Sequence, residues 1–391
     1  MTVSPDPPYL VVRPRGRRPW RERLLTACFR LARFVGARLQ QPPVLPSGPC
    51  RILVIKPCCL GDVLMTTPVL AALRARFPDA AIDYAVGRHA APAIAGHPEA
   101  RRLVEAGPGG GRGLRNLLAL LRRMQAGRYE LCLVLERSPL FTVLPWLAGI
   151  PARAGIDSGG RGFALNVRVP WDESLHEADL YLSVAAAVGC PVEGHTLRFE
   201  PGPAAVARVE QLWADQGLRR PVVAIAPGGG TNPGMDLPEK RWLPERFAAL
   251  ADRLHQDHGA TIAILGGPLD RAACEAMRAA MRGPSLDLWG PAPFAERGAF
   301  LRRCALYVGN DSGPTHLAVA VGCPVVAIFG PTDPVLYGPY HARARTVRRD
   351  LACSPCFIHG HFPPCPNQHA CMQGLPLEEV LASCRELLGC R

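Results

Sequence analysis

The chain has 391 residues and a formal net charge of +12, and this length suits two domains of ordinary size. A hydrophobic fraction of 48% can bury a large core and excludes a wholly disordered chain, while 41 prolines and 39 glycines indicate many short turns instead of a repeat or long-helix architecture. The positive charge suggests an anionic partner, but the total alone does not distinguish a nucleic acid, a membrane or a phosphorylated small molecule.

The basic charge is concentrated in an N-terminal arm, residues 1–48, where nine arginines face two acidic residues. Between Trp20 and Leu39 apolar residues recur every three or four positions, which predicts an amphipathic helix. We expect residues 13–39 to bind an anionic membrane surface; a helix docked on its own protein and a disordered basic tail are the alternatives. Because aromatics are only 6% of the chain and the rest of it is only modestly basic, we expect no nucleic-acid partner.

The cysteines and the absence of a secretory signal predict a cytoplasmic chain. No apolar run reaches the ~18 to 20 residues of a membrane span, so the predicted location is peripheral, on the inner face of the cytoplasmic membrane. In that reducing compartment most of the 15 cysteines are expected to be small buried hydrophobes.

The predicted elements of the first half form a β-loop-α-β opening. A strand over residues 51–57 leads into Leu60-Gly61-Asp62, a helical stretch ends at Phe77, and two further strands follow. The later strands are Ile82–Val86 and Leu131–Leu135. Glycines between Gly107 and Gly113 are interpreted as a turn, because they lack the strand-to-helix setting of a dinucleotide-binding motif.

The second half repeats the pattern, with four strands that each end in a glycine-containing turn. These strands are Val222–Ala226, Thr261–Leu265, Ala305–Val308 and Val325–Phe329. In a parallel sheet such turns share the carboxyl edge, where backbone amides and helix N-termini favour phosphate. The prediction is an α/β chain of two Rossmann-like, doubly wound domains facing a cleft, with a linker near residues 200–221 and a helix over Pro244–His258.

Three places carry groups able to do chemistry. Asp62 follows the first strand and could act as a general base or merely cap a helix. Lys240 and Arg241, expected at a helix start, could neutralise a leaving diphosphate or be ordinary surface charge. A polar cluster that suits phosphate and ribose is formed by Asp311, Ser312, Gly313, Thr315 and His316. The sequence contains no Asp-x-Asp pair for a nucleotide-bound divalent ion, so these groups would have to hold the diphosphate themselves.

A cysteine array near the C-terminus has the spacing C-x2-C-x8-C-x5-C. Its members are Cys353, Cys356, Cys365 and Cys371, with His359, His361 and His369 interspersed. The C-x2-C element favours a thiophilic metal, whereas the other spacings fit no standard zinc module. A structural zinc and a set of reduced thiols therefore both stay open.

Three separated motifs resemble those of glycosyltransferase family 9, the ADP-heptose:lipopolysaccharide heptosyltransferases. They are ILVIKPCCLGDVLMTTP at 52–68, KRW with PERF at 240–247, and GNDSGPTHL at 309–317 continuing to FGPTDP at 329–334. The cysteine-rich tail also resembles that of many members, and the likeness covers about residues 51–388. Two departures stand out: Cys58 and Cys59 occupy positions where members often have small or hydroxyl residues, and the loop over 228–239 looks longer than usual.

The resemblance implies a GT-B-type fold and an inverting, metal-independent transfer of a heptose or related sugar from ADP-heptose, or a similar nucleotide sugar, to a lipopolysaccharide core or other envelope glycan. It implies that Asp62 is the general base and that Lys240 stabilises the departing diphosphate. The expected substrate-binding residues are Gly61, Thr231, Arg241, Gly266, Gly267, Asp311, Ser312, Gly313, Thr315 and His316.

The expected domains are an acceptor domain over 49–205, a donor domain over 206–375 and a C-terminal helix over 376–391 that returns to the first domain. The alternatives to a transferase are a nucleotide-sugar epimerase on the same scaffold and a non-catalytic nucleotide-sugar-binding protein at the membrane.

Overall fold

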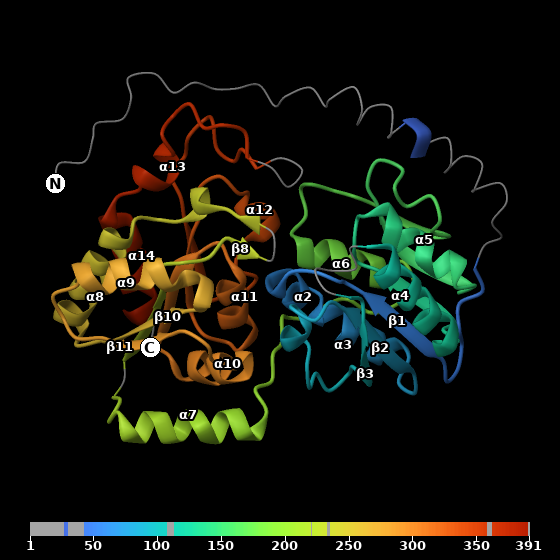
Figure 1. Ribbon diagram of the computed structural model, residues 1–391, viewed down its shortest axis with the longest axis horizontal. Coiled ribbons are helices and arrows are strands. Elements are labelled where there is room, and N and C mark those ends of the chain that lie inside the picture. Colours follow the sequence, from blue (N-terminus) through green and yellow to red (C-terminus); the bar gives the residue numbers. More distant parts are fainter. Residues whose placement is uncertain are drawn as a thin grey trace. The chain divides into compact units, whose positions relative to one another are not determined.

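The computed structural model describes residues 27–29, 43–107, 113–219, 221–232, 235–357 and 362–389. These residues fall into two compact units, with the border between Arg198 and Phe199 (Figure 1). Of the predicted arm helix only Ala27–Phe29 is described, as a short helical piece, and the rest of that prediction lies outside the described residues. No helix in the described ranges is both long enough and apolar enough to cross a membrane.

The N-terminal unit is built on a parallel six-stranded sheet in the order β3-β2-β1-β4-β5-β6. Its strands are β1 (Arg51–Ile55), β2 (Ala81–Val86), β3 (Arg102–Glu105), β4 (Leu131–Val134), β5 (Ala152–Asp157) and β6 (Val167–Pro170). Its α-helices are α2 (Leu60–Met65), α3 (Thr67–Arg76), α4 (Leu114–Gly127), α5 (Pro139–Leu147) and α6 (Glu177–Ala186). Helices α4 and α5 pack on the face that carries Leu53 and Ile55, while α3 and α6 pack on each other.

The C-terminal unit repeats this topology, with a parallel sheet in the order β11-β10-β7-β12-β13-β14. Its strands are β7 (Val222–Ala226), β10 (Thr261–Gly266), β11 (Leu286–Trp289), β12 (Leu306–Asn310), β13 (Val325–Ile328) and β14 (Ala344–Val347), with a small antiparallel pair β8 (Thr231–Asn232) and β9 (Met235–Asp236). Its α-helices are α7 (Pro203–Asp215), α8 (Pro244–His258), α9 (Arg271–Ala280), α10 (Phe294–Arg303), α11 (Gly313–Ala320), α12 (Pro334–Tyr337), α13 (Ala370–Gln373) and α14 (Leu377–Gly389).

Both sheets have the doubly wound order 3-2-1-4-5-6 when their strands are numbered within the unit. In that order the chain reverses direction of winding between the first and fourth strands, that is, between β1 and β4 and between β7 and β12. Ligands of such folds bind outside the carboxyl ends of the strands at this point. All the strands that the sequence predicts are present, within a residue or two of their expected ends.

Three local predictions differ from the structure. The segment expected as a linker contains helix α7, which packs on α10 and places Trp213 beside Phe300, with ring centroids 5.4 Å apart. The last helix, α14, buries Val380 and Leu381 in the core of the C-terminal unit, so the expectation that it returns to the first domain is wrong. Lys240 does not begin a helix: it ends a short 3-10 turn, and α8 begins at Pro244.

Buried thiols support the interpretation of most cysteines as small hydrophobes. All 14 cysteines for which a side chain is described are free, and those buried are Cys50, Cys132, Cys190, Cys274, Cys304, Cys323, Cys371 and Cys384. Burial raises the pKa of Cys190 and Cys274 to about 12 each, so these thiols stay protonated at neutral pH.

Candidate active site

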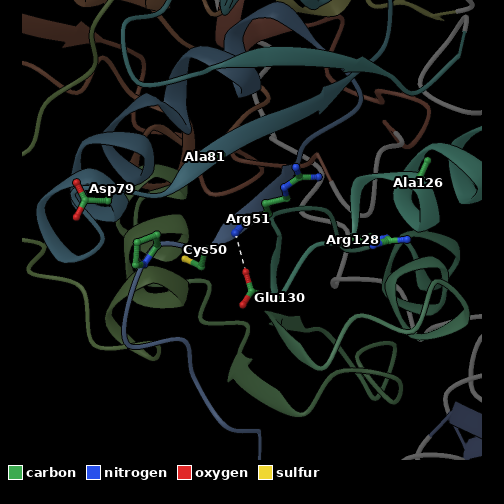
Figure 2. A pocket seen from close by; sticks show the side chains of 8 residues that line it. Cys50, Arg51, Asp79, Ala81, Ala126, Arg128 and Glu130 are labelled. Atoms are coloured by element: carbon green, nitrogen blue, oxygen red, sulfur yellow. Dashed lines mark hydrogen bonds between the residues drawn. The ribbon is translucent and has the colours of Figure 1, made fainter.

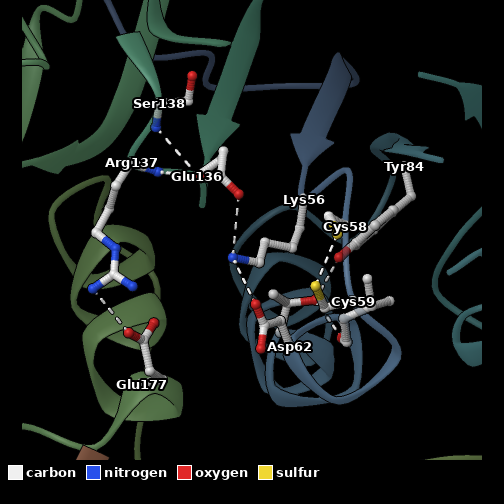
Figure 3. A network of polar contacts seen from close by, with 11 residues as sticks. Lys56, Cys58, Cys59, Asp62, Tyr84, Glu136, Arg137, Ser138 and Glu177 are labelled. Carbon is white, nitrogen blue, oxygen red and sulfur yellow. Dashed lines mark hydrogen bonds and ion pairs between the residues drawn. The ribbon is translucent and has the colours of Figure 1, made fainter. Parts of the chain in front are cut away.

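In the N-terminal unit, a buried lysine sits between two carboxylates at the carboxyl edge of β1 and β4. The Nζ atom of Lys56 lies 3.3 Å from Oδ2 of Asp62 and 3.4 Å from Oε2 of Glu136 (Figure 3). The ring of Tyr181 lies 5.4 Å from the same ammonium. Because β1 and β4 are neighbours at the switch point, residues 80 positions apart in the chain meet there.

The charges of this network support one another. Burial lowers the pKa of Lys56, but Glu136, Tyr181 and Asp62 outweigh burial and hold that pKa well above its ordinary value. Burial raises the pKa of Glu136, but Lys56 and Arg137 outweigh it, so the Glu136 pKa lies below its ordinary value. The backbone amides of Arg137 and Ser138 also donate to Oε1 of Glu136, at 2.9 and 3.3 Å. At neutral pH the lysine is therefore charged and Glu136 is ionised.

Asp62 is the member of this network that reaches solvent. Its side chain is 37% exposed, against 6% for Lys56 and 22% for Glu136. It lies in the first turn of α2, whose N-cap residue is Cys59, so Asp62 is not the cap that the alternative interpretation required. A carboxylate held by a buried ammonium and open on its other side can accept a proton from an external hydroxyl.

In the C-terminal unit, Asn310 at the end of β12 ties three segments together. Its side-chain amide donates to the carbonyls of Pro227 and Gly228, at 3.0 and 2.9 Å, and its oxygen accepts from the backbone amide of Trp242 at 3.0 Å. Asn310 is fully buried. The loops after β7 and β12 are thus held to the segment that carries Lys240.

Asp270 joins two of the glycine-containing turns. Its carboxylate accepts from the amides of Gly229 and Gly267, both at 2.8 Å. A side chain on Gly228 would collide with Asp270, and one on Gly229, whose φ is +104°, would lie 2.6 Å from Cβ of Ser312. These glycines are required because the loop passes close to its neighbours.

Lys240 and Arg241 are both held by partners from the predicted site. The Nζ atom of Lys240 lies 2.6 Å from Oδ2 of Asp311, and both side chains are largely buried. The guanidinium of Arg241 donates to the carbonyl of Gly229 and to Oγ1 of Thr231, both at 2.8 Å, and pairs with Asp236. The structure therefore brings together the Lys240 motif and the cluster at 311–316.

Other members of the predicted cluster shape the loop. Oγ of Ser312 and Oγ1 of Thr315 both donate to the carbonyl of Asn310, at 3.2 and 2.7 Å. Thr315 and His316 are buried, and Gly313 is the first residue of α11. The sequence-predicted residues Gly61 and Gly266 lie in α2 and at the end of β10.

The model of glycosyltransferase family 9 (heptosyltransferase) matches residues 117–363, more than half of the chain. The chain belongs to this family. It is 26% identical over 353 residues to lipopolysaccharide heptosyltransferase 3 of Escherichia coli K12, covering 84% of this chain and 95% of that protein. It is 29% identical over 314 residues to lipooligosaccharide heptosyltransferase 2 of Haemophilus influenzae, covering 76% of this chain and 88% of that protein.

Solved structures agree with the family. A glycosyltransferase family 9 protein from Veillonella parvula superposes with a TM-score of 0.76 at 25% identity, covering 88% of this chain and 99% of that one. The ADP-heptose lipopolysaccharide heptosyltransferase II of E. coli gives a TM-score of 0.67 at 24% identity, covering 86% and 98%. The chain is a glycosyltransferase, and the predicted GT-B-type fold is confirmed by the two parallel sheets and these neighbours.

The cysteine array of this glycosyltransferase does not form a metal site in the part of the chain that the structure describes. No group of three or more His, Cys, Asp or Glu side chains there could hold a metal ion. Burial raises the pKa of Cys356 to about 11 and that of Cys371 to about 12. The zinc expectation is therefore not supported; His359 and His361 lie outside the described residues.

A hollow of about 760 Å³ in the N-terminal unit lies away from the predicted chemistry (Figure 2). It is lined by Pro49, Cys50, Arg51, Asp79, Ala81, Ala126, Arg128 and Glu130. These residues surround the amino end of β1, whereas Lys56 and Asp62 follow its carboxyl end. None of the predicted site residues lines this hollow, and ligands of doubly wound folds bind at the opposite edge.

Sequence reasoning missed four residues that hold the site: Lys56, Glu136, Asp270 and Asn310. Lys56 and Asn310 stand directly after or at the end of buried strands, and that position was a usable signal. Glu136 and Asp270 gave no signal of their own, because their partners are distant in the sequence or are backbone amides.

Proposed function

We propose that this glycosyltransferase moves a heptose or a related sugar from ADP-heptose, or a similar nucleotide sugar, to a lipopolysaccharide core or another envelope glycan. The observation that carries the proposal is the pair of built sites at the carboxyl edges, Asp62 with Lys56 and Lys240 with Asp311. The names of the relatives support the donor and the acceptor: one similar protein is a lipopolysaccharide heptosyltransferase, and another is described with ADP. The comparisons do not favour an epimerase or a non-catalytic binding protein.

The proposed reaction is an inverting displacement. Asp62 takes the proton of the acceptor hydroxyl as that oxygen forms a bond to the anomeric carbon. The bond from the anomeric carbon to the diphosphate oxygen breaks, and the diphosphate leaves with the electron pair. Lys56 keeps Asp62 in place through its 3.3 Å contact. Charge builds on the leaving oxygen, so a fixed ammonium such as that of Lys240 stabilises the transition state more than the bound donor.

The remaining predicted residues are proposed to hold the donor. The backbone amides of Ser312 and Gly313 at the start of α11 suit a diphosphate, because helix N-termini favour anions. The side chains of Arg241 and Thr231 are joined by a hydrogen bond of 2.8 Å, and both residues lie in or beside the loop over 228–239. Within this scheme residues 49–205 form the acceptor domain, residues 206–375 the donor domain and residues 376–391 the C-terminal helix. No step in it calls for a metal ion.

A peripheral membrane location completes the proposal, with an anionic membrane surface as the partner of residues 13–39. The basic composition of this arm supports it. The N-terminal unit also exposes large apolar side chains on α5, namely Leu140, Trp146 and Leu147. Flotation with vesicles of phosphatidylglycerol and phosphatidylethanolamine tests this part: deletion of residues 1–48 should reduce binding, and unchanged flotation would contradict it.

Product analysis tests the transferase proposal. The purified enzyme is incubated with ADP-heptose and a heptose-deficient lipopolysaccharide core, and both substrates are then examined by mass spectrometry and NMR. The proposal predicts an acceptor that carries one more heptose with inverted anomeric configuration. An epimerised donor with an unmodified acceptor, or a bound donor that stays unchanged, would contradict it.

A further inference from the structure

Two adjacent cysteines stand at the turn between β1 and the helix that carries Asp62. The Sγ atoms of Cys58 and Cys59 lie 2.8 Å apart, and both side chains are only half-buried (Figure 3). Most other described thiols are buried. These two sulfurs therefore combine mutual contact with access to solvent.

The backbone at this turn is strained. Cys59 has φ 70°, in the left-handed region that residues with a side chain rarely adopt. Such strain is concentrated at functional sites, where the surrounding structure holds it in place. The carbonyl of Cys59 accepts from the amide of Val63 at 3.0 Å and so begins α2, the helix whose first turn contains Asp62.

The two thiols are chemically unequal. The hydrogen bond between the two thiols lowers the pKa of Cys58, with a smaller contribution from Lys56, while the same bond and burial raise the pKa of Cys59. A thiolate is the nucleophilic form of cysteine, so Cys58 is the one prepared to attack. Cys59 lies in contact and is placed to complete a disulfide.

We propose that Cys58 and Cys59 form a vicinal dithiol that a peroxide oxidises reversibly to a disulfide, and that this oxidation slows the enzyme by displacing the first turn of α2. The thiolate of Cys58 attacks a peroxide oxygen, which breaks the O–O bond and gives a sulfenic acid, with release of water from hydrogen peroxide. The sulfur of Cys59 then attacks Sγ of Cys58, the S–S bond forms, and the sulfenic oxygen leaves as a second water with the remaining protons. The peroxide is the oxidant and is reduced by two electrons.

The disulfide would be easy to reduce again. Adjacent Cα atoms are about 3.8 Å apart across a trans peptide, below the usual disulfide range of about 4.4–6.8 Å. A bond outside that range is strained and more reducible, which is typical of regulatory disulfides. A dithiol such as dithiothreitol should therefore restore the reduced pair.

The effect on catalysis rests on the proposed role of Asp62, whereas formation of the disulfide does not. A disulfide between adjacent cysteines closes a small ring and changes the backbone at Cys59. Asp62 is three residues further on in the same turn. The contact of 3.3 Å between Asp62 and Lys56 depends on the position of that turn.

The full-length enzyme is treated with hydrogen peroxide, alkylated with iodoacetamide and digested for mass spectrometry. The peptide with Cys58 and Cys59 should lose two hydrogen atoms, resist alkylation and become alkylated again after dithiothreitol. Amide hydrogen exchange in α2 should rise on oxidation, and the transfer rate should fall and recover in parallel. The Cys58→Ser variant should lose all these responses. The Cys59→Gly variant should stop at the sulfenic acid of Cys58, which adds one oxygen, and should lose the disulfide and the rise in α2 exchange; glycine at position 59 adopts the positive φ without strain.

Cys365→Ser is the matched control, because Cys365 is exposed but distant in sequence, and this variant should respond to peroxide as the wild type does. The proposal is overturned if both thiols remain open to alkylation after peroxide. It is also overturned if peroxide lowers the transfer rate of Cys58→Ser as much as it lowers that of the wild type. If the reduced enzyme transfers no sugar while the disulfide still forms and α2 exchange rises, the proposed function fails and the dithiol assignment stands.

Discussion

Replacing Lys56 by methionine would leave two carboxylates without their shared cation. Methionine keeps a long unbranched side chain, so the substitution removes charge with little loss of volume. The side chain of Lys56 is 6% exposed and that of Glu136 is 22% exposed, and removal of one partner from a buried pair costs about 3–5 kcal/mol. Asp62 is 37% exposed and keeps part of its hydration, so we expect the low end, about 3 kcal/mol.

Scanning calorimetry of the full chain measures this loss. A domain of about 150–250 residues loses roughly 2–4 °C in Tm per kcal/mol, so the transition of the N-terminal unit should fall by about 6–12 °C. The matched control is Arg88→Met, which breaks a 3.0 Å ion pair with Glu105 in which both partners are exposed. Exposed pairs contribute about 0–1 kcal/mol, so this control should shift the same transition by no more than about 4 °C.

The double variant Lys56→Met/Glu136→Gln separates lost charge from lost packing. It should melt above Lys56→Met alone, because glutamine leaves no buried, unpaired carboxylate. Equal shifts for Lys56→Met and Arg88→Met would refute the reasoning, since Lys56 would then contribute no more than a surface cation.

Three further predictions concern the charges and the loops. Lys240→Ala should lower kcat by about 10²–10³ with little change in donor Kd, as for removal of one preorganised transition-state donor, and steady-state kinetics with isothermal titration calorimetry checks both; an equal loss in donor affinity would contradict it. Asn310→Ala removes the hydrogen bonds to the carbonyls of Pro227 and Gly228 and should lower the free energy of unfolding by at least about 2 kcal/mol. Calorimetry should show a lower melting transition of the C-terminal unit, and an unchanged transition would contradict a stabilising role of these hydrogen bonds. The pKa of Glu136 is lower in the folded chain than in the unfolded chain, so the unfolded chain binds the proton first and stability is lost as the pH falls below about 4.3 and through the pKa of the folded chain. Glu136→Gln should therefore make Tm less dependent on pH in that acid range. Parallel curves of Tm against pH for the variant and the wild type would contradict this.

Most interior strands of the two parallel sheets were predictable from the sequence, and their edge strands were not. Strands such as β1 and β7 are continuous apolar runs because both faces of a parallel sheet are covered. The strands without a sequence prediction include all four sheet edges, β3, β6, β11 and β14, which carry charged or half-exposed residues. An edge strand has only one hydrogen-bonded neighbour and can keep polar side chains.

β5 is the one interior strand that the sequence did not predict. Its apolar run is interrupted by Arg153. This side chain is buried, and its guanidinium donates to the carbonyls of Ile150 and Ala164, at 2.6 and 2.9 Å. A buried, hydrogen-bonded arginine follows from tertiary contacts, which local periodicity does not contain.

The candidate site also has a part that the sequence indicates and a part that only the tertiary structure shows. Asp62, Lys240 and Asp311 are recognisable because each lies in a short local motif. The contacts of these residues follow from topology. Glu136 reaches Lys56 because β4 lies beside β1. Asp311 reaches Lys240 because the Asn310 side chain is hydrogen-bonded to the segment before α8. The sequence could therefore nominate candidate site residues but not the side chains that hold them.

The transfer rate of Asp62→Asn tests the central claim most directly. The measurement follows heptose transfer from ADP-heptose to a lipopolysaccharide core acceptor with enzyme in excess, beside Asp79→Asn, whose carboxylate lines the hollow at the opposite edge of the same sheet. We expect a rate lower by about 10²–10⁴ for Asp62→Asn, with donor affinity unchanged and Asp79→Asn close to the wild type. Transfer by Asp62→Asn at the wild-type rate would contradict it.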